Sequence, residues 1–99
     1  MAYFLGRLIG PRPTFPADIT ETEKRFMGHH VDYWTPLLEQ GKILALGPVA
    51  DPKGTWGLGI FDVADEKEVL ALTTNDPVIR ANLGFRYEVF PMPRLLFRK

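Results

Sequence analysis

The 99-residue sequence contains no cysteine, carries no net charge and has no long hydrophobic run. Without cysteine, the chain cannot form disulfides, thiol-based active sites, iron–sulfur clusters or thiolate zinc sites. Twelve basic residues balance twelve acidic ones, so the chain lacks the positive field that dominates nucleic-acid affinity. We therefore expect no nucleic-acid partner. The same balance removes charge repulsion between copies and agrees with self-association.

No window approaches the roughly 18 apolar residues of a membrane span, so no membrane partner is expected either. The apolar start of the chain, residues 1–9, has no basic residue before it and is interrupted by Arg7, unlike a secretory signal. We expect a cytoplasmic protein. The chain is 45% hydrophobic and 24% charged, which is ordinary for a globular protein, and its length predicts a single domain over 1–99.

Apolar patterns and turn residues predict six elements in the order β-α-β-β-α-β. A hydroxyl or carboxylate followed three residues later by Glu marks each helix start, and Gly41 is a good terminator for the first helix. This order predicts a ferredoxin-like α+β fold with an antiparallel sheet. Strands are expected at 2–9, 43–49, 56–63 and 85–91, and helices at 21–40 and 66–75.

Proline and glycine positions add three local expectations. Pro36 lies inside the first predicted helix and has no N–H for the carbonyl of Asp32, so we expect a kink or a break there. Residues 11–20, with three prolines, are typical of a stiff connector. The glycines within 54–59 precede a strand rather than a helix and lack the lysine–hydroxyl ending, which excludes a nucleotide loop.

The two adjacent histidines of the first predicted helix face different surroundings. At about 100° per residue, the apolar side chains form one arc with His30 near its middle, while His29 lies toward the polar side. A buried imidazole needs a hydrogen-bond partner, so His30 is either a core residue bonded to a backbone carbonyl or a general acid or base. Neighbouring histidines diverge on a helix and no spaced ligand set accompanies them, so no metal site is expected.

Asp76 stands where the second predicted helix ends, directly before Pro77. The negative end of a helix dipole disfavours a carboxylate by roughly 0.3–1 kcal/mol. Such a residue can persist because it caps the following turn. It can also persist because a nearby cation compensates its negative charge, and His30 is then the candidate.

Four short motifs in order make the chain resemble the YCII family of small bacterial proteins. A histidine eleven residues before a helix-ending glycine, as in His30 to Gly41, selects His30 over His29. The resemblance covers residues 3–91, and Pro36, Asn82 and the 11–20 segment depart from it. The motifs are His30-Val-Asp-Tyr33, Leu37-Leu-Glu-Gln-Gly-Lys42, Gly47-Pro-Val-Ala-Asp51 and Asn75-Asp-Pro77.

The resemblance implies a dimeric α+β barrel and an active site in which His30 and Asp76 form a catalytic dyad. The family includes dehydrochlorinases of chlorinated hydroxyquinols, and muconolactone isomerases share the architecture. We therefore hypothesise a cofactorless lyase or isomerase acting on a small cyclic or phenolic substrate. Substrate-binding residues are expected to be Tyr33 and Trp34, as an aromatic wall, together with Pro48 and Asp51. The alternative is a non-catalytic domain that binds a small molecule, or serves assembly, through the same cleft.

The amount of apolar surface on the strands also predicts a homodimer. Helices on one face of a ferredoxin-like sheet leave the other face open, and apolar strand residues exceed what one helical layer can cover. Exposed apolar patches of that size usually mark an interface, and two-fold pairing is the commonest solution. The residues in question are Phe4, Leu44, Leu46, Leu58, Ile60 and Tyr87.

Overall fold

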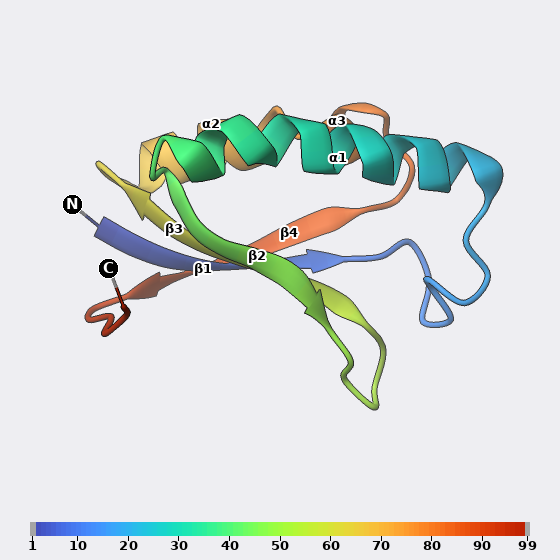
Figure 1. Cartoon of the computed structure of the whole chain (residues 1–99). Helices are drawn as coiled ribbons and strands as arrows, with labels where there is room; N and C mark the ends of the chain where they lie inside the picture. Colours follow the sequence, from blue (N-terminus) through green and yellow to red (C-terminus); the bar gives the residue numbers. More distant parts are fainter. Residues whose placement is uncertain (1, 99) are drawn as a thin grey trace.

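The computed structural model describes residues 2–98 and confirms the predicted α+β, ferredoxin-like order of elements, with one short helix added. All helices lie on one face of the sheet, and no described helix covers the other face (Figure 1). Residues 1 and 99, the ends of the predicted domain, lie outside the described residues. The strands are β1 (Ala2–Ile9), β2 (Ile43–Val49), β3 (Trp56–Val63) and β4 (Arg86–Met92); the helices are α1 (Glu21–Glu39), α2 (Glu66–Thr74) and α3 (Pro77–Arg80).

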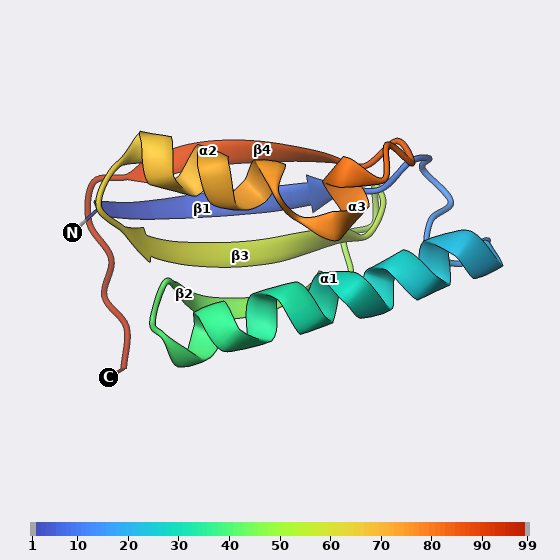
Figure 2. The same ribbon diagram turned by 90° about the horizontal axis from the view of Figure 1, so that it is seen from above.

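The four strands form one antiparallel sheet in the order β2-β3-β1-β4 (Figure 2). On the central strand β1, the buried residues alternate, so that Phe4, Gly6 and Leu8 face the helices. Leu8 pairs with Gly57 on one side and with Tyr87 on the other, which puts these two residues on the same face. The pairing register thereby decides which strand residues meet the helices.

Local sequence signals set the helix ends as predicted. Thr20 and Glu23 form the complete capping box at the start of α1, and the Asp65 side chain accepts from the Glu68 N–H at the start of α2. Gly41, just beyond α1, has a φ of 81°, which favours glycine. Asn82 also adopts a positive φ, 57°, a conformation that asparagine tolerates better than most residues.

Of the kink or break expected at Pro36, the break is wrong. The helix α1 continues through Pro36 to Glu39, and the next carbonyl contact is made normally, from the Gln40 N–H to the Pro36 oxygen at 3.0 Å. Pro36 lies in the last turn, where few hydrogen bonds remain to be broken. The Asp32 carbonyl that loses its donor belongs to an exposed residue, so water can replace the missing N–H.

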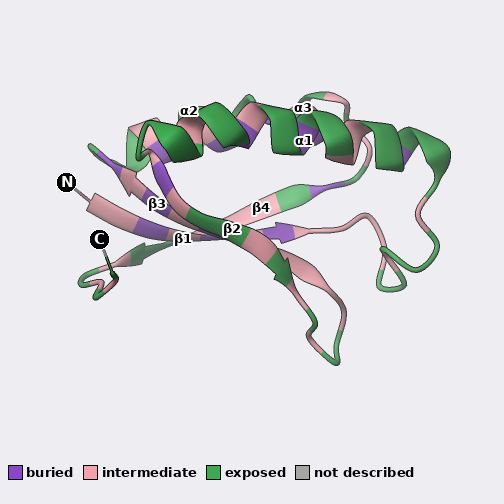
Figure 3. Cartoon of the chain, in the orientation of Figure 1, coloured by how far each residue is buried: buried purple, intermediate pink, exposed green. Residues whose placement is uncertain are grey.

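The core consists of two apolar clusters between the helices and the sheet (Figure 3). The larger is built around the fully buried Trp34 and Phe61, and the smaller around Leu8, Val78 and Phe85. No helix among residues 2–98 is long and apolar enough to cross a membrane.

The uncovered sheet face differs in part from the sequence-based expectation. Phe4 is buried on the helix side, and Tyr87 and Leu46 line a cavity on that side, so these three do not belong to the open surface. Leu58 and Ile60 pair with residues that alternate away from the helices, which keeps both on the open face, and Leu58 also borders the cavity. Alternation along a strand separates two sets of side chains, but the register decides which set meets the helices.

Candidate active site

A cavity of about 450 Å³ lies between α1 and the sheet. Its walls come from the segment before α1, one face of α1, the strands β2 and β3, and the start of β4. Nearly all of the lining is apolar, and the polar side chains that reach it include His30, Thr55 and Tyr87. A deep apolar space with few convergent polar groups is the usual form of a small-molecule site.

Glycines on β3 make the floor of this cavity. Gly57 and Gly59 stand two residues apart, on the helix-facing side of the strand, and both line the cavity. A Cβ on Gly59 would lie 3.1 Å from the Phe61 ring, and one on Gly57 would lie 3.3 Å from Leu8 Cβ. Their role in the site is not among the sequence-based expectations, which only excluded a nucleotide loop here. The i, i+2 spacing within a strand is the available signal, because it places two missing side chains on one face.

His30 lines the cavity and is also hydrogen-bonded to a residue in the protein interior. The side chain is only 6% exposed, whereas His29 is exposed, as the angular positions on the helix predict. The Nδ1 atom of His30 lies 2.7 Å from Oδ2 of Asp76. An ionised carboxylate can only accept, so Nδ1 carries the proton and Nε2 of the neutral ring holds the lone pair. Within residues 2–98, no side chain or backbone group is hydrogen-bonded to Nε2.

Asp76 is a fully buried carboxylate with four hydrogen-bond donors. Its Oδ2 accepts from His30, from Trp34 Nε1 at 2.8 Å and from the Tyr87 hydroxyl at 2.5 Å. Its Oδ1 accepts from the Val78 N–H at 3.1 Å, because Asp76 is the N-cap of α3. Burial alone raises the pKa of Asp76, but the bonds from His30, Tyr87 and Trp34 outweigh it and hold the pKa below its ordinary value.

The short helix α3 explains why a carboxylate is tolerated at this point. The sequence places Asp76 at the unfavourable C-terminal end of α2 and allows two explanations, a cap or a partner. In the structure, Asp76 caps α3 and also contacts His30, so both hold at once. At an N-cap the peptide N–H groups stabilise a negative charge.

Tyr33 and Trp34 lie elsewhere than the expected aromatic wall. Trp34 is 0% exposed in the core and donates to Asp76, and Tyr33 donates to the Leu72 carbonyl at 2.7 Å. Neither ring lines the cavity. The arc on the helical wheel that holds both rings is turned toward the sheet and α2, so Trp34 supports Asp76 and neither ring is placed to contact a ligand.

Tyr87 is a further site residue that sequence reasoning missed. It lines the cavity and donates to the same carboxylate oxygen as His30. Burial and the nearby negative charge of Asp76 raise the pKa of Tyr87 well above its ordinary value of 10, so the hydroxyl keeps its proton. The alternation of β4 is visible in the sequence, but only its register against β1 directs this ring toward the helices.

The motif over residues 47–51 contributes Gly47 and Pro48 to the cavity lining and Asp51 indirectly. Pro48 lines the cavity. Asp51 does not, but its Oδ2 accepts from the indole N–H of Trp56, a lining residue, at 3.1 Å, and its backbone carbonyl accepts from the Gly54 N–H at 2.9 Å. The backbone N–H of Lys53 and the indole N–H of Trp56 both donate to Asp51 and lower its pKa. Asp51 therefore orients the side chain of Trp56.

Among residues 2–98, no group of three or more His, Cys, Asp or Glu side chains is placed to hold a metal ion. The arrangement offers the His30 ring on an apolar cavity, with a buried carboxylate bonded to its Nδ1. Such an arrangement can move a proton to or from a bound molecule.

Fold and cavity together define a small ferredoxin-like protein with a histidine on an apolar cavity. The description "YCII-related domain" matches residues 7–93, so the chain belongs to the YCII family. Among solved structures, it is similar to 5-chloro-2-hydroxyhydroquinone dehydrochlorinase (TftG) from Burkholderia phenoliruptrix, in complex with 2,5-dihydroxybenzoquinone. The two chains are 22% identical, 91% of each is covered, and the TM-score is 0.65, which shows a shared fold. No curated protein matches the sequence.

Proposed function

We propose that this protein is a cofactorless lyase or isomerase in which His30 is the general base and Asp76 its partner in a dyad. The observation that carries the proposal is the position of His30, whose Nδ1 is held by a buried carboxylate while the ring lines an apolar cavity. The hydrogen bond to Asp76 selects the tautomer that leaves Nε2 free to accept a proton. The negative charge then stabilises the imidazolium that forms.

The chemistry follows from where the accepted proton goes. His30 Nε2 takes a proton from a hydroxyl or from an activated carbon of the substrate. Returning it to a different carbon completes an isomerisation. If an anionic leaving group departs with the bonding electrons instead, the result is an elimination, and the proton leaves with the solvent. Neither the isomerisation nor the elimination changes the oxidation state of the protein.

The walls of the cavity favour a small and mainly apolar substrate. A volume of about 450 Å³ lies within the usual range for small-molecule sites, roughly 300–1,000 Å³. An apolar lining also strengthens the interaction between His30 and Asp76, because it lowers the local dielectric around the pair. The structural neighbour is described as acting on a chlorinated hydroxyhydroquinone, which supports phenols as the first compounds to test.

Deuterium exchange tests the proposed base on any phenol that binds, whatever the natural substrate is. A thermal-shift panel of phenols, lactones and small acids first identifies ligands, which are then incubated with the protein in D₂O. We expect the wild type to accelerate deuterium incorporation at ring carbons of a bound phenol, followed by NMR. His30→Gln should abolish the acceleration, and His29→Gln, its exposed neighbour on α1, should leave it unchanged.

The same experiment separates catalysis from binding alone. If ligands bind and His30→Gln weakens their binding only modestly, while the wild type exchanges no protons with any of them, the chain is a binding domain. Equal exchange in the wild type and in His30→Gln would likewise remove His30 as the base.

We also propose that two copies of the chain pair through the uncovered sheet face. No described helix lies on this face (Figure 1). Leu58 and Ile60 of β3 sit there beside Leu5 of β1, and Phe90 of β4 is 46% exposed. Apolar strand surface of this kind is stabilised when a second copy covers it. The electrically neutral composition adds no charge repulsion between the copies.

A further inference from the structure

The segment over residues 11–20, one of the departures from the family resemblance, forms one wall of the cavity. Phe15, Pro16 and Ile19 line the same cavity as His30. The segment connects β1 to α1 and contains no helix or strand. A connector without regular structure would ordinarily be a poor wall, so what holds it in place decides whether it can discriminate between ligands.

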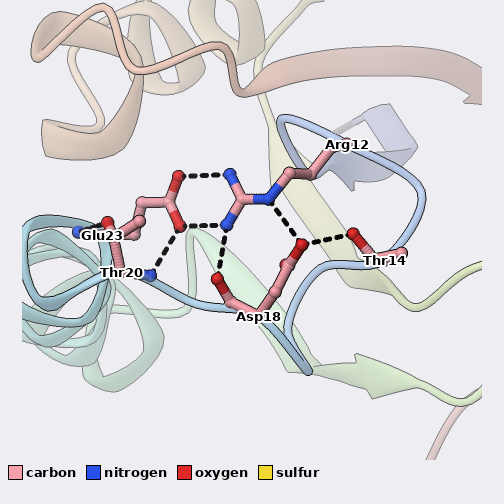
Figure 4. Close-up of polar contacts among 5 residues, drawn as sticks. All are labelled: Arg12, Thr14, Asp18, Thr20 and Glu23. Carbon is pink, nitrogen blue, oxygen red and sulfur yellow. Dashed lines mark hydrogen bonds and ion pairs between the residues drawn. The ribbon is translucent and has the colours of Figure 1, made fainter.

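Arg12 clamps the segment to the start of α1 (Figure 4). Its guanidinium donates from Nη1 to Glu23 Oε2 and from Nη2 to Glu23 Oε1, both at 2.7 Å. The same group contacts the Asp18 carboxylate from Nε at 2.9 Å and donates to the Asp18 carbonyl at 2.8 Å. The bidentate pair with Glu23 fixes both the distance and the orientation of the guanidinium. One side chain thereby ties both ends of the segment together.

The Phe15 ring is held as firmly as the backbone behind it. It packs edge-on against Phe85, with ring centroids 5.2 Å apart. It also lies so close to Gly10 that a Cβ there would be 2.7 Å from the ring. Backbone bonds from Phe15 to Arg12 and from Ala17 to Thr14 form consecutive turns around it. Phe15 therefore has little room to swing away from a ligand.

We infer that Phe15 is a specificity-determining residue, and that Arg12 positions it through the clamp. This inference rests on the proposed function, in that it assumes a ligand whose ionisable hydroxyl reaches His30. The ligand class is a monocyclic phenol with small apolar substituents, and Phe15 sets the largest substituent that fits. The segment acts as a preformed wall, since its contacts are complete without a ligand.

Calorimetric titration with 2-, 3- and 4-alkylphenols of increasing chain length tests the inference. Each added methylene should tighten the Kd by about fourfold while it enters apolar space. In the series whose substituent points at Phe15, the affinity of the wild type should then fall by about tenfold or more at the length where the alkyl substituent reaches the Phe15 ring. Phe15→Ala should move that limit to longer chains.

Two further variants complete the test. Phe26→Ala is the matched control, because Phe26 packs in the same cluster as Phe15 without lining the cavity, and its limit should equal that of the wild type. In Arg12→Gln the loss of affinity should be spread over several alkyl lengths, while the far-ultraviolet circular dichroism stays unchanged. If Phe15→Ala fails to fold, Phe15→Leu and Arg12→Gln carry the test.

The outcomes separate this inference from the proposed base. An unchanged limit in both Phe15 variants, or an equal shift in Phe26→Ala, overturns the role of Phe15. Failure of every alkylphenol to bind the wild type overturns the ligand class. If Phe15 sets a length limit but no deuterium exchange occurs, the role of Phe15 stands and His30 is rejected as the base. If exchange occurs but no length limit is found, His30 stands as the base and the role of Phe15 is rejected.

Discussion

The Nδ1 atom of His30 lies 2.7 Å from Oδ2 of Asp76, and this contact joins a cavity residue of α1 to the N-cap of α3. The two residues are 46 positions apart in the chain. Trp34 and Tyr87 donate to the same oxygen, so the carboxylate is the centre of a buried polar group that spans three elements. A fully satisfied network of this kind holds a side chain in one orientation.

Asp76→Ala should destabilise the protein far more than His30→Ala. Removing the carboxylate leaves the N–H groups of Trp34 and Val78 buried without an acceptor, and each such group costs about 1–3 kcal/mol, so we expect a loss of about 3 kcal/mol or more. His30→Ala should cost less than about 1 kcal/mol, because water in the cavity can replace the ring and Asp76 keeps its other donors. Urea unfolding measures both.

His29→Ala is the control for this pair, since an exposed residue should change the free energy of unfolding by no more than about 0.5 kcal/mol. A loss in His30→Ala as large as that in Asp76→Ala would make His30 a structural core residue.

Stability should fall at alkaline pH because of Tyr87. Burial and the charge of Asp76 raise the pKa of this hydroxyl in the folded protein above its ordinary value of 10. A raised pKa favours the folded state fully below pH 10, and the contribution is lost as the pH rises above 10, where the unfolded chain releases the proton. Unfolding free energies measured between pH 8 and about 11 should fall less steeply in Tyr87→Phe. Equal slopes would contradict the buried position of the hydroxyl.

The Arg12 clamp should open in acid. The hydrogen bonds from Arg12 lower the pKa of Glu23 from 4.5 to about 2. A lowered carboxyl pKa stabilises the closed segment fully above pH 4.5, and the contribution is lost as the pH falls toward 2. The protection of the Ala17 and Ile19 amides against hydrogen exchange, taken relative to the intrinsic exchange rate at each pH, should therefore fall over this interval. In Arg12→Gln, exchange at these amides should already be fast at about pH 7, and protection equal to the wild type would count against the clamp.

A charge on the uncovered sheet face should separate the proposed dimer. Ile60→Glu places a carboxylate among the apolar strand residues of that face, and the mass in light scattering should fall to that of one chain. Leu70→Glu, at an exposed position of α2, is the matched control and should leave the mass unchanged. A wild-type mass of one chain at every concentration would reject the dimer.

Much of the fold was predictable because its signals are local. The capping box of Thr20 and Glu23 involves residues three positions apart, and Gly41 ends α1 by its own dihedral preference. The opposite surroundings of His29 and His30 follow from helical geometry alone. Pro36 shows the limit of such reasoning, since its effect depends on which residues near the helix end can be solvated.

The candidate site depended on contacts that the linear sequence does not specify. Trp34 was expected in the ligand wall, but α1 packs so that its ring is turned into the core toward Asp76. Tyr87 entered the site through the register of β4 against β1, where a shift of one residue would have turned it to the open face.

The sequence by itself determined the order of elements, the ends of the helices and the inward position of His30, because periodicity and capping act over a few residues. Tertiary structure alone decided the cavity, since its glycine floor, its Phe15 wall and the donors to Asp76 come from separate segments. Hydrogen bonds and close packing act only at contact distance, so these partners are chosen when the helices settle on the sheet.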